Sequence, residues 1–166
     1  MAENKTVQQN LSIVVDDGSE RVPILNKHGD EIGVFYIRPT DIGIIDRYNK
    51  VAKDFDKITA PLENLNINPD GTVDEKDEAE KAAMDEAVKN LNEACDYLFD
   101  GNMSEAFFGK MHPFSPVKGR FYCEIALNAV ANFISHQFDR EVAKINNRME
   151  RYTHGYRTGK HRNGKK

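Results

Sequence analysis

The chain contains no tryptophan and only two cysteines among its 166 residues. Cys95 and Cys123 are too few for a disulfide framework, and neither belongs to a CxxC redox pair. No apolar run approaches the roughly 18 residues that a membrane-spanning helix requires, and the start of the chain lacks the apolar core of a secretory signal. These absences predict a cytoplasmic protein with two buried, reduced thiols and no membrane contact.

The sequence also lacks the common catalytic and phosphate-binding patterns. GxxxxGK[ST], GxGxxG, HExxH and GxSxG are all missing. Neither cysteine has a histidine at a zinc-ligand spacing, and the five histidines are scattered along the chain. We therefore predict a protein that is not an enzyme and that needs no cofactor.

Acidic residues are missing from one end of the chain. Residues 151–166 (RYTHGYRTGKHRNGKK) contain six Lys/Arg and no Asp/Glu. Residues 1–118 contain 13 Lys/Arg and 23 Asp/Glu, a net charge of −10, whereas residues 119–166 contain 10 and 4, a net charge of +6. A chain divided in this way is typical of an interaction protein whose two ends meet different partners or the opposite ends of its own copies.

What is present predicts an α+β fold, mainly α. In residues 1–38, short apolar runs at 11–15, 21–25 and 31–38 are separated by clusters of Asp, Asn and Gly. This pattern predicts a small antiparallel β meander. Pro23 lacks the N–H that a central strand would donate, so its strand is expected at an edge or to begin after it.

Residues 39–152 predict a helical bundle of three main helices, the last of them long. The first helix follows a Thr40 or Asp41 cap, and Pro61 is expected to end or kink it near residues 59–60. Its apolar seam alternates spacings of four and three at Ile44, Tyr48, Val51, Phe55, Ile58 and Leu62. An acidic loop at about 64–78 leads to a second helix at 75–99, which Asp100-Gly101-Asn102 is expected to stop.

A proline-rich connector, 103–118, is predicted to hold a short helix at 104–108 capped by Ser104. The third helix is predicted over 119–152, about 50 Å long. That length leaves two interpretations open: part of its apolar stripe is covered by another chain, or the helix bends near Ser135-His136 and packs internally. Residues 153–166 are predicted to form a basic, disordered tail.

The acidic loop partly matches a calcium-binding EF-hand loop. Oxygen-bearing side chains stand at the expected spacing, and Gly71 stands at the sixth position; the candidate ligands are Asn66, Asn68, Asp70, Asp74 and Asp77. The match is imperfect because the first position is Asn, the last is Asp instead of Glu, and Pro69 stiffens the turn. A calcium-binding helix–loop–helix module is therefore retained as an alternative.

Nucleic acid is a second alternative partner. The basic end carries Tyr152, His154 and Tyr156, whose rings could stack on bases while its cations neutralise phosphates. The acidic bulk of the chain opposes such binding, so this interpretation ranks below binding to protein. The same tail could dock onto an acidic protein surface.

Three places carry a resemblance to a known family. They are RPTD at 38–41, where a strand gives way to a helix; LFDG at 98–101 with AFFG at 106–109; and the helix 121–152, rich in Phe and Arg. In this order they resemble the tail assembly chaperones of long, non-contractile-tailed phages (siphophages) of Gram-positive hosts. The connector of this chain is longer and richer in proline than in that family, and its basic end is unusual.

The resemblance implies a chaperone that self-associates, coats the tape measure protein and helps to recruit tail tube subunits. Such a protein acts in the cytoplasm of the host bacterium and is not expected in the mature virion. The residues to which we assign partner binding lie on the last helix: Phe133, Phe138, Arg140, Val142, Ile145, Arg148, Met149 and Arg151. The opposite charges of the two parts of the chain would let copies stack head to tail.

Overall fold

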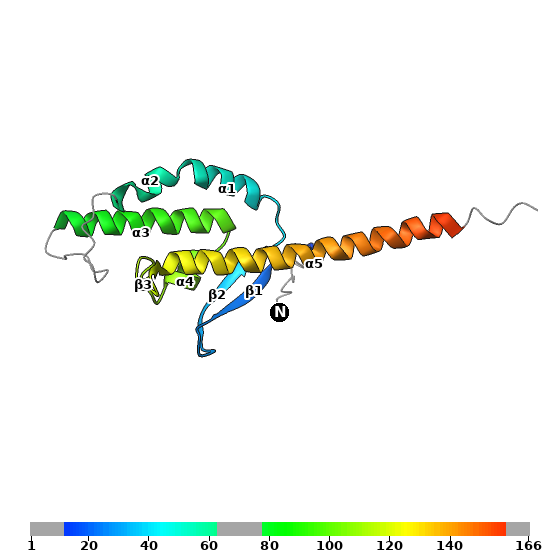
Figure 1. The fold of residues 1–166 in the computed structure, drawn as a ribbon, viewed down its shortest axis with the longest axis horizontal. Helices are drawn as coiled ribbons and strands as arrows, with labels where there is room; N and C mark the ends of the chain where they lie inside the picture. The colour runs from blue at the N-terminus through cyan, green and yellow to red at the C-terminus, as the bar shows by residue number, and fades with distance from the viewer. Residues whose placement is uncertain (1–11, 63–77, 159–166) are drawn as a thin grey trace, which may run out of the picture.

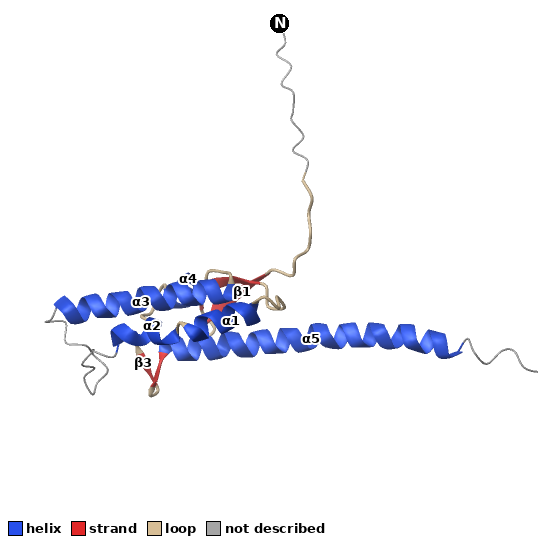
Figure 2. Ribbon diagram, turned by 90° about the horizontal axis from the view of Figure 1, so that it is seen from above, coloured by secondary structure: helices blue, strands red, loops and turns tan. Residues whose placement is uncertain are grey.

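A computed structural model describes residues 12–62 and 78–158 of the chain. The predicted α+β, mainly α class is confirmed (Figure 1). An antiparallel hairpin near the N-terminus precedes the helices α1 (Ile44–Lys53), α2 (Phe55–Thr59), α3 (Glu78–Phe99), α4 (Met103–Phe108) and α5 (Tyr122–Thr158). Helices α1 and α2 run along α3, and α5 extends far beyond all of them (Figures 1 and 2).

The hairpin pairs β1 (Glu20–Leu25) with β2 (Glu31–Ile37). Its turn is held by the side-chain oxygen of Asn26, which accepts hydrogen bonds from the backbone N–H groups of His28 at 2.8 Å and Asp30 at 3.0 Å. Gly29 in this turn has a φ of 90°, which a residue with a Cβ rarely adopts.

Both outer edges of this hairpin are closed to a further strand. The Asn102 side chain accepts a hydrogen bond from Tyr36 N–H at 2.9 Å and donates one to Val34 C=O at 3.0 Å, so these two β2 groups point away from β1. Pro23 is the partner of Val34 in the register, and its nitrogen therefore faces the outer edge of β1. Proline thus removes no hydrogen bond from the ladder and leaves that edge one donor short.

The prediction of a strand at 11–15 was wrong. Leu11 lies outside the described residues, and residues 12–19 form no strand; Ile13 and Val14 are 94% and 92% exposed. In Figure 2 the segment before β1 leads away from the helices. Ile13 and Val14 have high β propensity, but their segment has no edge to pair with. Asn102 covers the outer edge of β2, and Pro23 stands on the outer edge of β1.

The first predicted helix is divided into three pieces. Helix α1 ends at Asp54, whose backbone N–H reaches the carbonyls of both Lys50 and Val51, and α2 starts directly after it. A 3₁₀ turn, η1 (Ala60–Leu62), then contains Pro61, so the predicted change near residues 59–60 is confirmed. The break at Asp54 was not predicted.

Helix α3 ends where the sequence predicted, with a left-handed residue just past its last turn. Asp100 has a φ of 46°; its N–H donates to Tyr97 C=O and the N–H of Gly101 to Asp96 C=O, which is a Schellman motif. The predicted cap of the next helix, Ser104, was wrong. The Asp96 carboxylate caps α4 instead, accepting hydrogen bonds from Ser104 N–H at 2.7 Å and from its hydroxyl at 2.5 Å.

Helix α5 begins three residues later than predicted because β3 (Pro116–Val117) and β4 (Arg120–Phe121) form a small hairpin before it. It then runs without a break through residues 135–136 to Thr158, six residues past the predicted end. Its 37 residues correspond to about 55 Å. Residues 159–166 of the predicted tail lie outside the described residues.

The core lies between the hairpin, α3, α4 and the first half of α5. Phe35 is its centre, with ring centroids 6.1 Å from Phe99 and 5.7 Å from Phe107 in edge-to-face geometry. The other buried apolar residues of this core are Ile37, Cys95, Met103, Ala106, Ala126 and Val130. None of the helices within the described ranges is both long and apolar enough to cross a membrane.

Candidate functional site: an apolar face of helix α5

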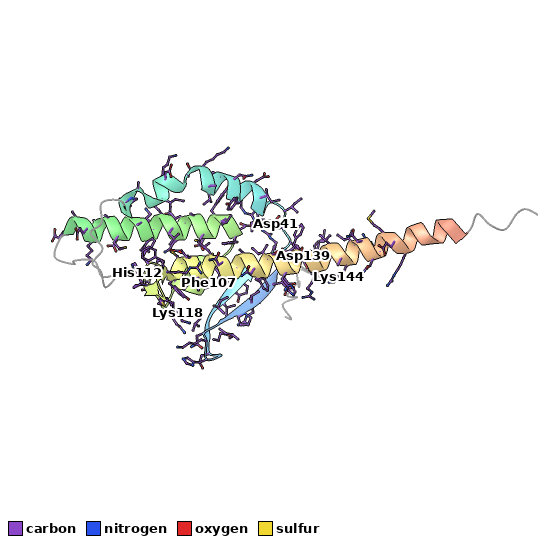
Figure 3. The ribbon with its side chains drawn as sticks, in the orientation of Figure 1. Asp41, Phe107, His112, Lys118, Asp139 and Lys144 are labelled. Carbon is purple, nitrogen blue, oxygen red and sulfur yellow. The ribbon has the colours of Figure 1, made fainter. Side chains whose placement is uncertain are left out.

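Helix α5 has two halves with different surroundings. Cys123, Ala126 and Val130 in the first half are buried at 6%, 3% and 3% exposure. Near Asp139 the helix begins to pass beyond the rest of the molecule, and Lys144 lies on the part that projects (Figure 3). We call residues 138–158 the projecting half. Over residues 138–151 of the projecting half, where side chains are described, four large apolar side chains are exposed: Phe138 (39%), Val142 (39%), Ile145 (48%) and Met149 (59%).

Seven of the eight residues predicted to bind a partner lie on this projecting half. The apolar four are accompanied by Arg140, which donates to the Gln137 side chain at 3.2 Å, and by the exposed Arg148 and Arg151. The structure separates Phe133 from them. Phe133 packs against the core beside the hairpin and lines a small hollow with Val22 and Ile24.

The projecting apolar residues continue a face that begins in the first half of α5. At about 100° per residue, seven positions fall within a sector of about 80°: Leu127, Ala131, Ile134, Phe138, Val142, Ile145 and Met149. The deeply buried Ala126 and Val130 lie on the neighbouring sector, which faces the core. We call these seven positions the α5 track; Leu127 to Met149 spans about 33 Å.

A groove of about 570 Å³ adjoins the first part of the α5 track. Most of its lining comes from three helices: Tyr48, Val51 and Ala52 of α1; Leu91, Ala94, Cys95 and Leu98 of α3; and Leu127, Asn128 and Ala131 of α5. Asp56 and Ile58 of α2 complete it. Tyr48 is 61% exposed, and Ile45, one turn earlier on α1, is 60% exposed. This side of α1 is therefore open to solvent. The sequence predicted Tyr48 and Val51 as members of one apolar seam, and both line the groove.

The α1 wall of the groove is fixed to the end of α3 by Arg47. Its Nε donates to Leu98 C=O at 2.8 Å, and its terminal nitrogen pairs with the Asp41 carboxylate at 3.0 Å. The same carboxylate accepts a hydrogen bond from Gly43 N–H at 2.9 Å. The Gly43 N–H and then the Arg47 guanidinium lower the pKa of Asp41, so it stays charged and keeps Arg47 in place.

The thiol of Cys95 lies at the floor of the groove. Burial, with smaller effects of Asp96 and Cys123, raises its pKa to about 12, and burial also raises the pKa of Cys123. Both cysteines are free. Each thiol therefore stays protonated near neutral pH and acts as a small apolar group.

The candidate calcium ligands Asn66, Asn68, Asp70, Asp74 and Asp77 lie outside the described residues. Across residues 12–62 and 78–158, no group of three His, Cys, Asp or Glu side chains is placed to hold a metal ion. No protein-family model, curated protein or solved structure matches the chain. The arrangement described here is an uninterrupted apolar track beside a groove with three helical walls, and this geometry suits a helical polypeptide.

Proposed function

We propose that this protein is a non-catalytic tail assembly chaperone of a siphophage, which coats the tape measure protein and helps to recruit tail tube subunits. It would act in the cytoplasm of the host bacterium and leave before the virion is complete. The observation that supports the proposal is the α5 track, which leaves Phe138, Val142, Ile145 and Met149 exposed on a helix that extends beyond its own core.

A tape measure protein is long and helical, and its apolar stripes aggregate unless they are covered. A coat for such a client must offer an apolar surface with helical spacing and a charged exterior. The α5 track supplies the apolar surface over about 33 Å. Arg140, Lys144, Arg148 and Arg151 supply charge around it, with Lys144 paired to Glu141 at 2.5 Å.

The proposal is tested by co-expression with the product of the large gene expected beside this one, followed by co-purification. The native chain is expected to bring that product into the soluble fraction. The double variant Val142→Asp/Ile145→Asp is expected to lose it, because two carboxylates would be buried against the apolar stripe of the client.

Ala143→Asp is the matched control. Ala143 is exposed on the projecting half but lies about 140° around α5 from Phe138. This control should retain the client. Equal recovery with the native chain and the double variant would show that the α5 track does not hold the client.

A further inference from the structure

We infer that a second copy of this chain covers the α5 track, so that two α5 helices lie antiparallel with Phe138 of one copy against Phe138 of the other. Two features of the chain point to this arrangement. One is the spacing of the apolar residues along the track, and the other is the distribution of charge between α5 and the remainder of the chain.

The spacing is symmetric about Phe138. Track residues stand 4, 7 and 11 positions before it, at Ile134, Ala131 and Leu127, and again 4, 7 and 11 positions after it, at Val142, Ile145 and Met149. An antiparallel pair related by a two-fold axis needs this symmetry, because every contact is made twice. It places Ile145 opposite Ala131 and Met149 opposite Leu127.

Size and exposure match in these pairs. Met149 and Ile145 meet Leu127 and Ala131, which line the groove, and Ala131 leaves room for Ile145. Val142 meets Ile134, which is partly buried against its own core. Each copy would insert its projecting half beside the α1 wall of the other, against Tyr48. Both exposed apolar surfaces, the projecting stripe and the groove wall, are covered by one contact.

Charge favours the same pairing. Residues 138–151 hold four cations, Arg140, Lys144, Arg148 and Arg151, and three acids, a net charge of +1, and residues 152–166 add five further cations without an acid. The projecting half would enter a body of net charge −10, where helix α3 holds six acidic residues and two lysines. Asp56 lines the groove, and an adjoining hollow is lined by Asp54 and Glu93 together with Lys50 and Lys57. The opposite charges favour entry of the basic helix into the acidic body.

The pairing closes on itself. Both copies use the same surface, so no α5 track is left exposed for a third copy to bind. The head-to-tail stack suggested by charge alone would instead continue to grow. The inference shares the α5 track with the proposed function: a client helix would displace the second copy. The pair would then keep the apolar face covered until a client is present.

Disulfide formation at the two-fold axis tests the arrangement. In the full chain, Phe138→Cys should form a covalent dimer on mild oxidation, because each introduced thiol meets its own copy. Ala143→Cys, exposed on the other side of α5, is the control; it should still pair but form little covalent dimer. The native Cys95 and Cys123 are 3% and 6% exposed and should not contribute.

Because Phe138→Cys removes part of the contact, the double variant Ala131→Cys/Ile145→Cys provides a second test. It should give a covalent dimer with two bridges. The unmodified chain at micromolar concentration should show twice the monomer mass of 18.9 kDa by light scattering, and Val142→Asp/Ile145→Asp should show the monomer mass.

A monomeric native chain, a larger open assembly, or equal cross-linking of Phe138→Cys and Ala143→Cys would each overturn the antiparallel pair. These outcomes leave the client experiment to be judged separately. Conversely, the chain could form a stable pair with the expected cross-links and still fail to recover the client. That result would contradict the proposed function and support the antiparallel pair.

Discussion

Asn102 does with one side chain what a neighbouring strand would otherwise do. It accepts from Tyr36 N–H and donates to Val34 C=O, and it stands directly between the end of α3 and the start of α4. A single amide therefore connects the hairpin to the helical part of the fold. The sequence predicted that residues 100–102 stop a helix, but it could not show a bond to a strand 66 positions away.

Asn102→Ala is expected to lower the free energy of unfolding by about 1–3 kcal/mol, because it leaves a strand donor and acceptor without their partner. Urea denaturation measures this change. Asn102→Asp keeps the acceptor for Tyr36 N–H but sets a carboxylate oxygen against the Val34 carbonyl, so it should not restore the stability lost with alanine. A stability unchanged by the alanine substitution would contradict the bridging role.

Elements were predictable where local sequence decides their limits. The stop of α3 was found because Asp100 and Gly101 form a Schellman motif, which depends on adjacent residues. The N-terminal cap of α4 was not predicted, because the capping residue, Asp96, belongs to another helix. The strand expected at 11–15 failed for the same reason, since a strand exists only where an edge accepts it.

The core half and the projecting half of the fold should respond differently to the same substitution. Met103→Ala removes a side chain that is fully buried and is expected to cost about 2–5 kcal/mol. Met149→Ala removes one that is 59% exposed on α5 and should change stability by about 0.5 kcal/mol or less in the monomer.

Chemical denaturation at concentrations low enough to keep the chain monomeric compares the two variants. The two methionines provide a control for each other because the residue removed is the same. Similar losses for both would mean that Met149 is buried within its own chain, and the α5 track would then not be a free surface.

At the scale of the whole molecule, the sequence predicted half of the candidate site. The four–three spacing from Phe138 to Met149 identified the projecting stripe, because both ends of the pattern lie on one helix. Phe133, which ends the preceding apolar stripe of the same helix, was assigned to the partner surface as well, yet it packs against the core. The groove was missed, since its walls on α1, α3 and α5 come together only in the tertiary structure.

The division of charge predicts how association should depend on salt. Attraction between residues 1–118, with a net charge of −10, and residues 119–166, with +6, acts over about 10 Å at 0.1 M salt and about 3 Å at 1 M. The dissociation constant of the antiparallel pair should therefore rise with salt in sedimentation experiments. The double variant Arg148→Gln/Arg151→Gln should show a smaller rise; identical constants at all salt concentrations would contradict an electrostatic contribution.

Pro23 also limits how two copies of this protein can associate through their sheets. Its ring nitrogen stands on the open side of the hairpin, and the opposite side is occupied by Asn102. The exposed Ile13 and Val14 have high β propensity, yet neither edge of the native sheet offers them a full row of hydrogen-bonding groups to extend. Strand pairing between folded copies is therefore disfavoured, and contacts between copies are left to helices.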